Sequence, residues 1–75
     1  MKEQLEKLGF SSKEADVYLA LLELGTAVVS DVAKKASINR STTYIILDSL
    51  AEKGFVSILE KQNIKFFFAT PPERL

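Results

Sequence analysis

Four polar side chains lie close together in the middle of the chain, where they could donate hydrogen bonds to phosphates and base edges. Arg40 can pair with a phosphate or a guanine, and the hydroxyl groups of Ser41 and Thr42 can donate to phosphate oxygens. Tyr44 adds a further polar group one helical turn after Arg40. We therefore predict nucleic-acid contacts at Arg40, Ser41, Thr42 and Tyr44, although Ser41 and Thr42 taken alone fit helix-capping residues equally well.

The residue after this polar group is apolar. On a helical register Ile45 lies beside Tyr44 on the outward side, where a basic or amide side chain would strengthen base readout. Ile45 could contact a thymine methyl group or could lie at the edge of the core, and both interpretations stay open.

A second polar group surrounds a turn at Gln62-Asn63. The runs from Phe55 to Lys61 and from Ile64 to Thr70 are rich in β-branched and aromatic residues, so they predict a β-hairpin. Lys61, Asn63 and Lys65 would flank its tip and could contact the nucleic-acid backbone or minor groove, although hairpin tips are commonly polar in any case.

Three consecutive phenylalanines in the second strand cannot share one face, because strand side chains alternate. We expect Phe67 to face the core with Ala69, which places Phe66 and Phe68, with Leu59 opposite, on the outer face. An exposed aromatic patch on so small a domain would suggest a partner surface. The opposite register, with Phe66 and Phe68 inside, stays open.

The helix that carries the first polar group runs from Asn39, a suitable N-cap, to Lys53. Its buried stripe comprises Thr43, Leu47 and Leu50 at steps of four and three. Gly54 suits the position just past the helix end, with Phe55 packing back on Leu50.

Upstream, a short N-terminal helix ends at Gly9, and Ser11 with Glu14 fits a capping box that opens a helix from Ser12 to Leu24. Its expected buried stripe comprises Ala15, Tyr18, Leu19, Leu21 and Leu22.

Residues 26–29 predict a strand stub, and Ser30-Asp31 predicts the start of a helix that ends near Ala36. Residues 37–39 form the turn to the next helix. The fold class is therefore α+β, mainly α: a winged helix-turn-helix between about Thr26 and Thr70, with three main helices, a two-stranded wing and a short N-terminal helix. Residues 72–75 could open another helix.

Composition limits the possible functions. Seventy-five residues support one core, so we expect residues 1–75 to form a single domain with no separate effector domain. Net charge is zero, but residues 1–33 carry six acidic and three basic side chains, whereas residues 34–65 carry six basic and three acidic ones. The sequence lacks His and Cys, phosphate-binding glycine loops and membrane-length apolar runs. We expect a cytoplasmic protein without enzymatic activity, metal, cofactor or small-molecule effector site.

Motifs along nearly the whole chain resemble the N-terminal domain of TrmB-type transcriptional regulators. They include residues 8–11, Glu14-Ala15, residues 17–22 and Gly25 in the first half, and residues 31–36, 38–44, 52–56 and 71–73 in the second. MarR-type repressors share the helix-turn-helix and the Gly54-Phe55-Val56 corner, whereas the stretch from Glu14 to Tyr18 and the double proline favour TrmB.

This resemblance implies DNA contact from Arg40, Ser41, Thr42 and Tyr44, with the wing between Lys61 and Lys65 touching the backbone. The wing departs from the family pattern, because Phe66 and Phe68 stand where basic residues are usual; this makes protein contact more plausible there. Family members continue into a dimerising helix and often a sugar-binding domain.

The function that these features predict is sequence-specific binding to double-stranded DNA by a transcriptional regulator. It would work as a homodimer, because one short helix reads too few base pairs. The alternative is a protein-interaction module that uses Leu59, Phe66 and Phe68.

Overall fold

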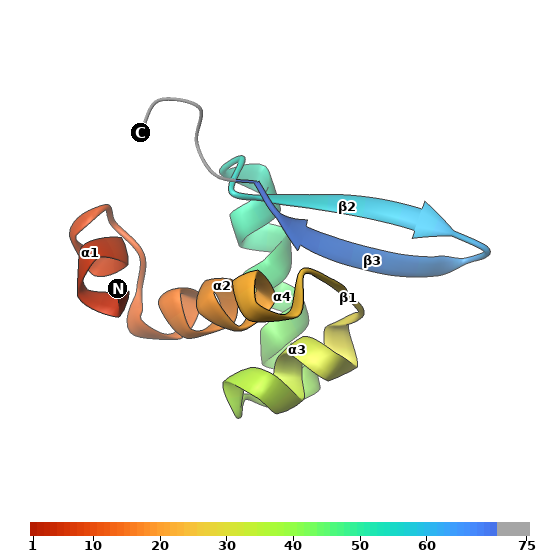
Figure 1. Ribbon diagram of the computed structural model, residues 1–75, viewed down its shortest axis with the longest axis horizontal. Coiled ribbons are helices and arrows are strands. Elements are labelled where there is room, and N and C mark those ends of the chain that lie inside the picture. Colours follow the sequence, from red (N-terminus) through yellow and green to blue (C-terminus); the bar gives the residue numbers. More distant parts are fainter. Residues whose placement is uncertain (71–75) are drawn as a thin grey trace.

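A computed structural model describes residues 1–70, within which helices and strands follow the winged helix-turn-helix order. The helices are α1 (Lys2–Lys7), α2 (Ser12–Leu24), α3 (Val29–Ala36) and α4 (Arg40–Glu52), and the strands are β1 (Thr26–Ala27), β2 (Val56–Lys61) and β3 (Ile64–Ala69). The β2–β3 hairpin extends away from the helices, with α1 at the opposite end of the molecule (Figure 1). The predicted three main helices, short N-terminal helix and wing are confirmed. The helix suggested for residues 72–75 lies outside the described residues.

Helix α2 begins at the predicted capping box. The Ser11 N–H donates to Glu14 Oε1 over 2.9 Å, and the Glu14 N–H donates to Ser11 Oγ over 3.1 Å. The predicted buried stripe was wrong at Leu22, which is 41% exposed, whereas Val17 and Ala20 are buried. The reason is that α1, α3, α4 and β3 all pack against α2. The buried face of α2 is therefore wider than the predicted stripe and is rotated away from Leu22.

The wing belongs to a three-stranded antiparallel sheet in the order β1-β3-β2, rather than standing as an isolated hairpin. Thr26 and Ala27 pair with Phe68 and Phe67. At the tip Gln62 and Asn63 have φ values of 54° and 66°, the conformation that a two-residue type I′ hairpin turn requires. The strand predicted over residues 26–29 comprises only Thr26 and Ala27, because Val29 already begins α3.

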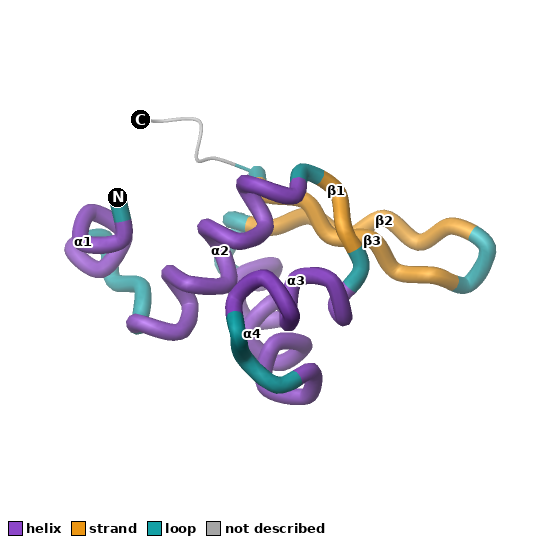
Figure 2. Tube along the Cα trace, turned by 60° about the horizontal axis from the view of Figure 1, so that its bottom comes forward, coloured by secondary structure: helices purple, strands orange, loops and turns teal. Residues whose placement is uncertain are grey.

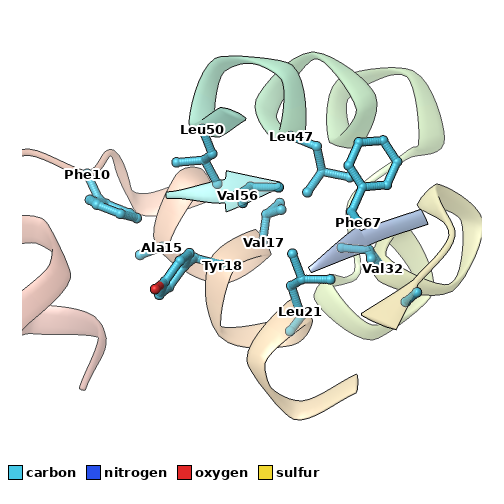
Figure 3. Packing of buried hydrophobic residues seen from close by; sticks show 12 residues of the cluster. Phe10, Ala15, Val17, Tyr18, Leu21, Val32, Leu47, Leu50, Val56 and Phe67 are labelled. Carbon is cyan, nitrogen blue, oxygen red and sulfur yellow. The ribbon is translucent and has the colours of Figure 1, made fainter. Parts of the chain in front are cut away.

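Side chains from α2 and α4 converge on the sheet to form the core (Figure 3). Phe67, Leu21 and Leu47 are fully buried, which confirms that Phe67 is the inward phenylalanine of the wing. Toward α1, Phe10 packs edge-on against Tyr18 and Phe55, with ring centroids 5.4 and 4.8 Å away. Burial of this kind is the main source of stability in so small a domain, and burial also raises the pKa of the Tyr18 phenol.

The turn between α3 and α4 sets the start of α4. Ser37 adopts the left-handed conformation with φ of 60°, and the Ile38 N–H donates to the Ala33 carbonyl over 3.1 Å. Asn39 then caps α4 by accepting from the Thr42 N–H over 2.8 Å, as predicted. The helix predicted to start at Ser30-Asp31 begins one residue earlier, at Val29, with Val28 at its N-cap and no side-chain cap bond, and Asp31 lies in its first turn. Figure 2 shows α3, this loop and α4 following one another on one side of the sheet.

The end of α4 is fixed by a Schellman arrangement. The Phe55 N–H donates to the Leu50 carbonyl over 2.9 Å, and the Gly54 N–H donates to the Ala51 carbonyl over 3.1 Å. Gly54 has φ of +88°, a conformation that residues with a Cβ rarely adopt. The chain therefore leaves α4 in one defined direction and enters β2, which places the wing relative to α4.

None of the helices between residues 1 and 70 has the length and apolar character needed to cross a membrane.

Candidate nucleic-acid interface

An open groove of about 880 Å³ separates the first half of α4 from the wing. The α4 side of the groove comprises Arg40, Ser41, Tyr44 and Ile45. The wing supplies Glu60, Asn63, Ile64, Lys65 and Phe67, and the start of α3 supplies Val28, Val29 and Ser30. Five residues predicted to contact nucleic acid therefore lie around one groove: Arg40, Ser41, Tyr44, Asn63 and Lys65.

Two predicted contact residues lie outside this group. Thr42 is half-buried on α4, and its backbone N–H is already bonded to Asn39. Lys61 pairs across the hairpin with Ile64, on the same face as Leu59, whereas Lys65 shares the opposite face with Phe67. The two wing lysines thus point to opposite sides of the sheet, and Lys65 is the one that faces α4.

Lys65 and Tyr44 join the wing to α4 directly. Lys65 Nζ donates to Tyr44 Oη over 2.8 Å and lies 5.4 Å from the centre of the tyrosine ring. The Tyr44 ring in turn packs edge-on against Phe67, with centroids 6.3 Å apart. The hydrogen bond and the charge interaction with Tyr44 raise the pKa of the exposed Lys65 ammonium group. This contact was not anticipated, because it links residues 21 positions apart through the placement of the wing.

The first turn of α4 contains no acidic residue, so its free N–H groups and partial positive charge are not offset there. Arg40 and Ser41 are exposed on this turn. Farther along, Asp48 is exposed on α4 and Glu60 lines the groove on the wing. Glu60 lies directly opposite Lys65 in the hairpin, so the uncompensated positive charge is at the N-terminal end of α4, and a polyanion would be attracted to this end of the groove.

The outer face of the wing carries the predicted apolar patch. Leu59 lies opposite Phe66 in the hairpin and is 51% exposed, while Phe68 is 36% exposed and Phe66 is half-buried. The predicted register of the three phenylalanines is thus confirmed. Ile64, which shares this face by alternation, extends the patch toward the tip and was missed because it begins the strand.

Comparison with known proteins identifies a family that matches this sequence. A family model described as "Sugar-specific transcriptional regulator TrmB" matches residues 5–73. The HTH-type sugar sensing transcriptional regulator TrmBL1 of Pyrococcus furiosus is 42% identical over 57 residues, which are 76% of this chain and 17% of that protein. The chain thus spans about a sixth of the length of that relative.

Solved structures show the same fold at low sequence identity. A MarR-family transcriptional regulator from Silicibacter pomeroyi superposes with a TM-score of 0.80 at 21% identity, covering 93% of this chain and 49% of that one. BpsR of Bordetella bronchiseptica, whose DNA binding is regulated by 6-hydroxynicotinic acid, gives 0.77 at 20% identity, covering 81% and 45%. The matching family and its Pyrococcus furiosus member are transcriptional regulators rather than enzymes, as the sequence predicted.

Proposed function

Because the chain belongs to the TrmB family of transcriptional regulators, we propose that α4 and the wing bind double-stranded DNA in a sequence-specific manner. Family membership confirms the resemblance seen in the motifs of the sequence. One observation carries the proposal: the exposed Arg40 and Ser41 at the start of α4 line the same groove as Lys65 of the wing.

The shape of the two elements suits a duplex. The first turns of α4 would enter the major groove, which is ~12 Å wide and accepts one helix. Arg40 would pair with a guanine edge or a phosphate, and Ser41 would donate to a phosphate. Lys65, held above α4 by Tyr44, would neutralise a phosphate of the flanking backbone.

Association of two copies would supply the affinity that one chain lacks. The net charge is zero and the exposed reading surface of α4 covers little more than its first turn, so one copy would contact few base pairs. A homodimer would double the phosphate and base contacts on two half-sites. As a regulator of this kind the protein would act in the cytoplasm, on chromosomal DNA.

The test is a fluorescence anisotropy titration of labelled genomic duplexes at several salt concentrations. We expect binding that weakens with salt, and a salt slope that is smaller by ~0.9 in Lys65→Ala, because alanine cannot neutralise the phosphate. Lys7→Ala, which removes an exposed cation on α1, is the matched control and should leave the slope unchanged. Absence of salt-sensitive binding to any duplex, even at high protein concentration, would refute the proposal.

A second candidate function is protein interaction through the outer wing face, favoured by the exposure of Leu59 and Phe68 beside Phe66. The double change Phe66→Ser and Phe68→Ser should abolish association, measured by sedimentation, while folding and DNA binding persist. If the variant associates like the native chain, the outer face is not the interface. Phe67→Ser is the contrasting variant, because Phe67 is fully buried and its loss should unfold the domain.

A further inference from the structure

Ile45 is a large apolar side chain for which the fold offers no packing role. It is 67% exposed, and among the large hydrophobic residues in the described part of the chain Met1 alone is more exposed. The core stripe of α4 is already supplied by Thr43, Leu47 and Leu50, all fully buried. In the free protein Ile45 therefore exposes apolar surface to water, and it contributes little to the free energy of unfolding.

Ile45 lies next to the candidate reading surface at the start of α4. It follows Ser41 by four residues, so both side chains lie on the same ridge of α4, and both line the groove with Arg40. The neighbouring Tyr44 hydroxyl is already bonded to Lys65, and its ring packs on Phe67. Ile45 is thus the side chain of this ridge that is free to meet a base by apolar contact.

The major-groove edge of a base pair offers one apolar group, the C5-methyl of thymine; the other positions are hydrogen-bond donors and acceptors. Resting on the DNA-binding function proposed above, we propose that Ile45 is a specificity-determining residue that selects thymine by packing against this methyl group. Cytosine lacks the methyl group, and its amino donor would meet an aliphatic side chain that cannot accept a hydrogen bond.

The test replaces thymine with deoxyuridine, which removes the methyl group and leaves base pairing unchanged. The probe is the duplex that the full chain selects from a random-sequence library, with its thymines replaced one at a time. Burial of one methyl group corresponds to about a fourfold change in affinity. We expect one position per half-site at which deoxyuridine weakens binding of the native chain about fourfold and leaves binding of Ile45→Ala unchanged.

Two further variants keep the result interpretable. Ile45→Gln also removes the branched aliphatic side chain, and like alanine the new residue favours a helix. DNA binding by this variant should likewise be insensitive to deoxyuridine at that position. Leu8→Ala, which shortens an exposed aliphatic side chain at the end of α1, should keep the full fourfold effect. Circular dichroism should show the same thermal unfolding for Ile45→Ala as for the native chain.

The outcomes separate this inference from the broader function. Salt-sensitive binding in which every deoxyuridine replacement affects the native chain and Ile45→Ala equally would overturn the role of Ile45 and leave DNA binding standing. The same conclusion would follow if the selected duplexes held no common thymine. Failure to bind any duplex would overturn both.

Discussion

Glu14 connects the start of α2 to the end of α4, and its replacement should loosen the attachment of the helix that we expect to read DNA. Its side chain is 13% exposed and accepts hydrogen bonds from the Ser11 N–H over 2.9 Å, Lys53 Nζ over 3.1 Å and Ser49 Oγ over 3.4 Å. Loss of the capping bond costs ~1 kcal/mol. Loss of the partly exposed ion pair and the hydroxyl contact adds about 1 kcal/mol.

We therefore expect Glu14→Ala to lower the free energy of unfolding by about 2 kcal/mol, which for a domain of this size lowers Tm by ~10 °C. Glu14→Gln keeps an oxygen for the Ser11 N–H but loses the ion pair, so its effect should be about half as large. Thermal unfolding followed by circular dichroism measures both. Glu6→Gln, which changes an exposed carboxylate on α1, is the matched control.

The pH dependence gives an independent check. The hydrogen bond from the Ser11 backbone holds the pKa of Glu14 below its ordinary value of about 4.5, with help from Lys53 and against the effect of burial. A carboxyl group with a depressed folded-state pKa contributes stability above its unfolded pKa, and that contribution is lost as pH falls through the folded pKa. The difference between native chain and Glu14→Gln should thus be constant at neutral pH and shrink below about pH 4.5. A difference that is absent at pH 7, or that persists undiminished in acid, would refute this account.

The two wing lysines and the glycine after α4 give further tests. Lys65→Ala should weaken duplex binding more than Lys61→Ala in a paired anisotropy titration, because Lys65 faces α4 and Lys61 does not. Equal losses of affinity would mean that the side of the wing on which a lysine lies does not affect DNA binding. Gly54→Ala should lower the free energy of unfolding in urea by about 1 kcal/mol, since alanine must adopt φ of +88° there. An unchanged midpoint would show that the helix end relaxes without cost.

Features set by local chemistry were predictable from the sequence. The capping box of Ser11 and Glu14, the Asn39 cap and the Gly54-Phe55 corner each depend on backbone groups a few residues away, and each formed as predicted. Strand alternation likewise predicted the inward position of Phe67.

Features set by distant contacts were not predictable in this way. The strand stub itself was predicted, but its pairing was not: Thr26 and Ala27 join the sheet because β3 lies beside them, and no local pattern indicates that partner. Leu22 is exposed because neighbouring elements cover a different side of α2. The bond between Lys65 and Tyr44 depends on the angle at which the wing leaves α4, which no local pattern encodes.

The pairing of β1 with β3 divides the wing into two mechanically different parts. Near Phe67 and Phe68 the sheet is three strands wide and joined to the helices, whereas toward Gln62 and Asn63 it is a ribbon of two strands. The base of the wing is therefore supported by a third strand, whereas its tip is supported by two strands only. Lys65 lies between these parts, so its contact with Tyr44 braces the ribbon just beyond the three-stranded part. We expect the two-stranded ribbon to be the part of the wing that bends, so in the proposed DNA complex it would follow variations in groove width without disturbing the helices.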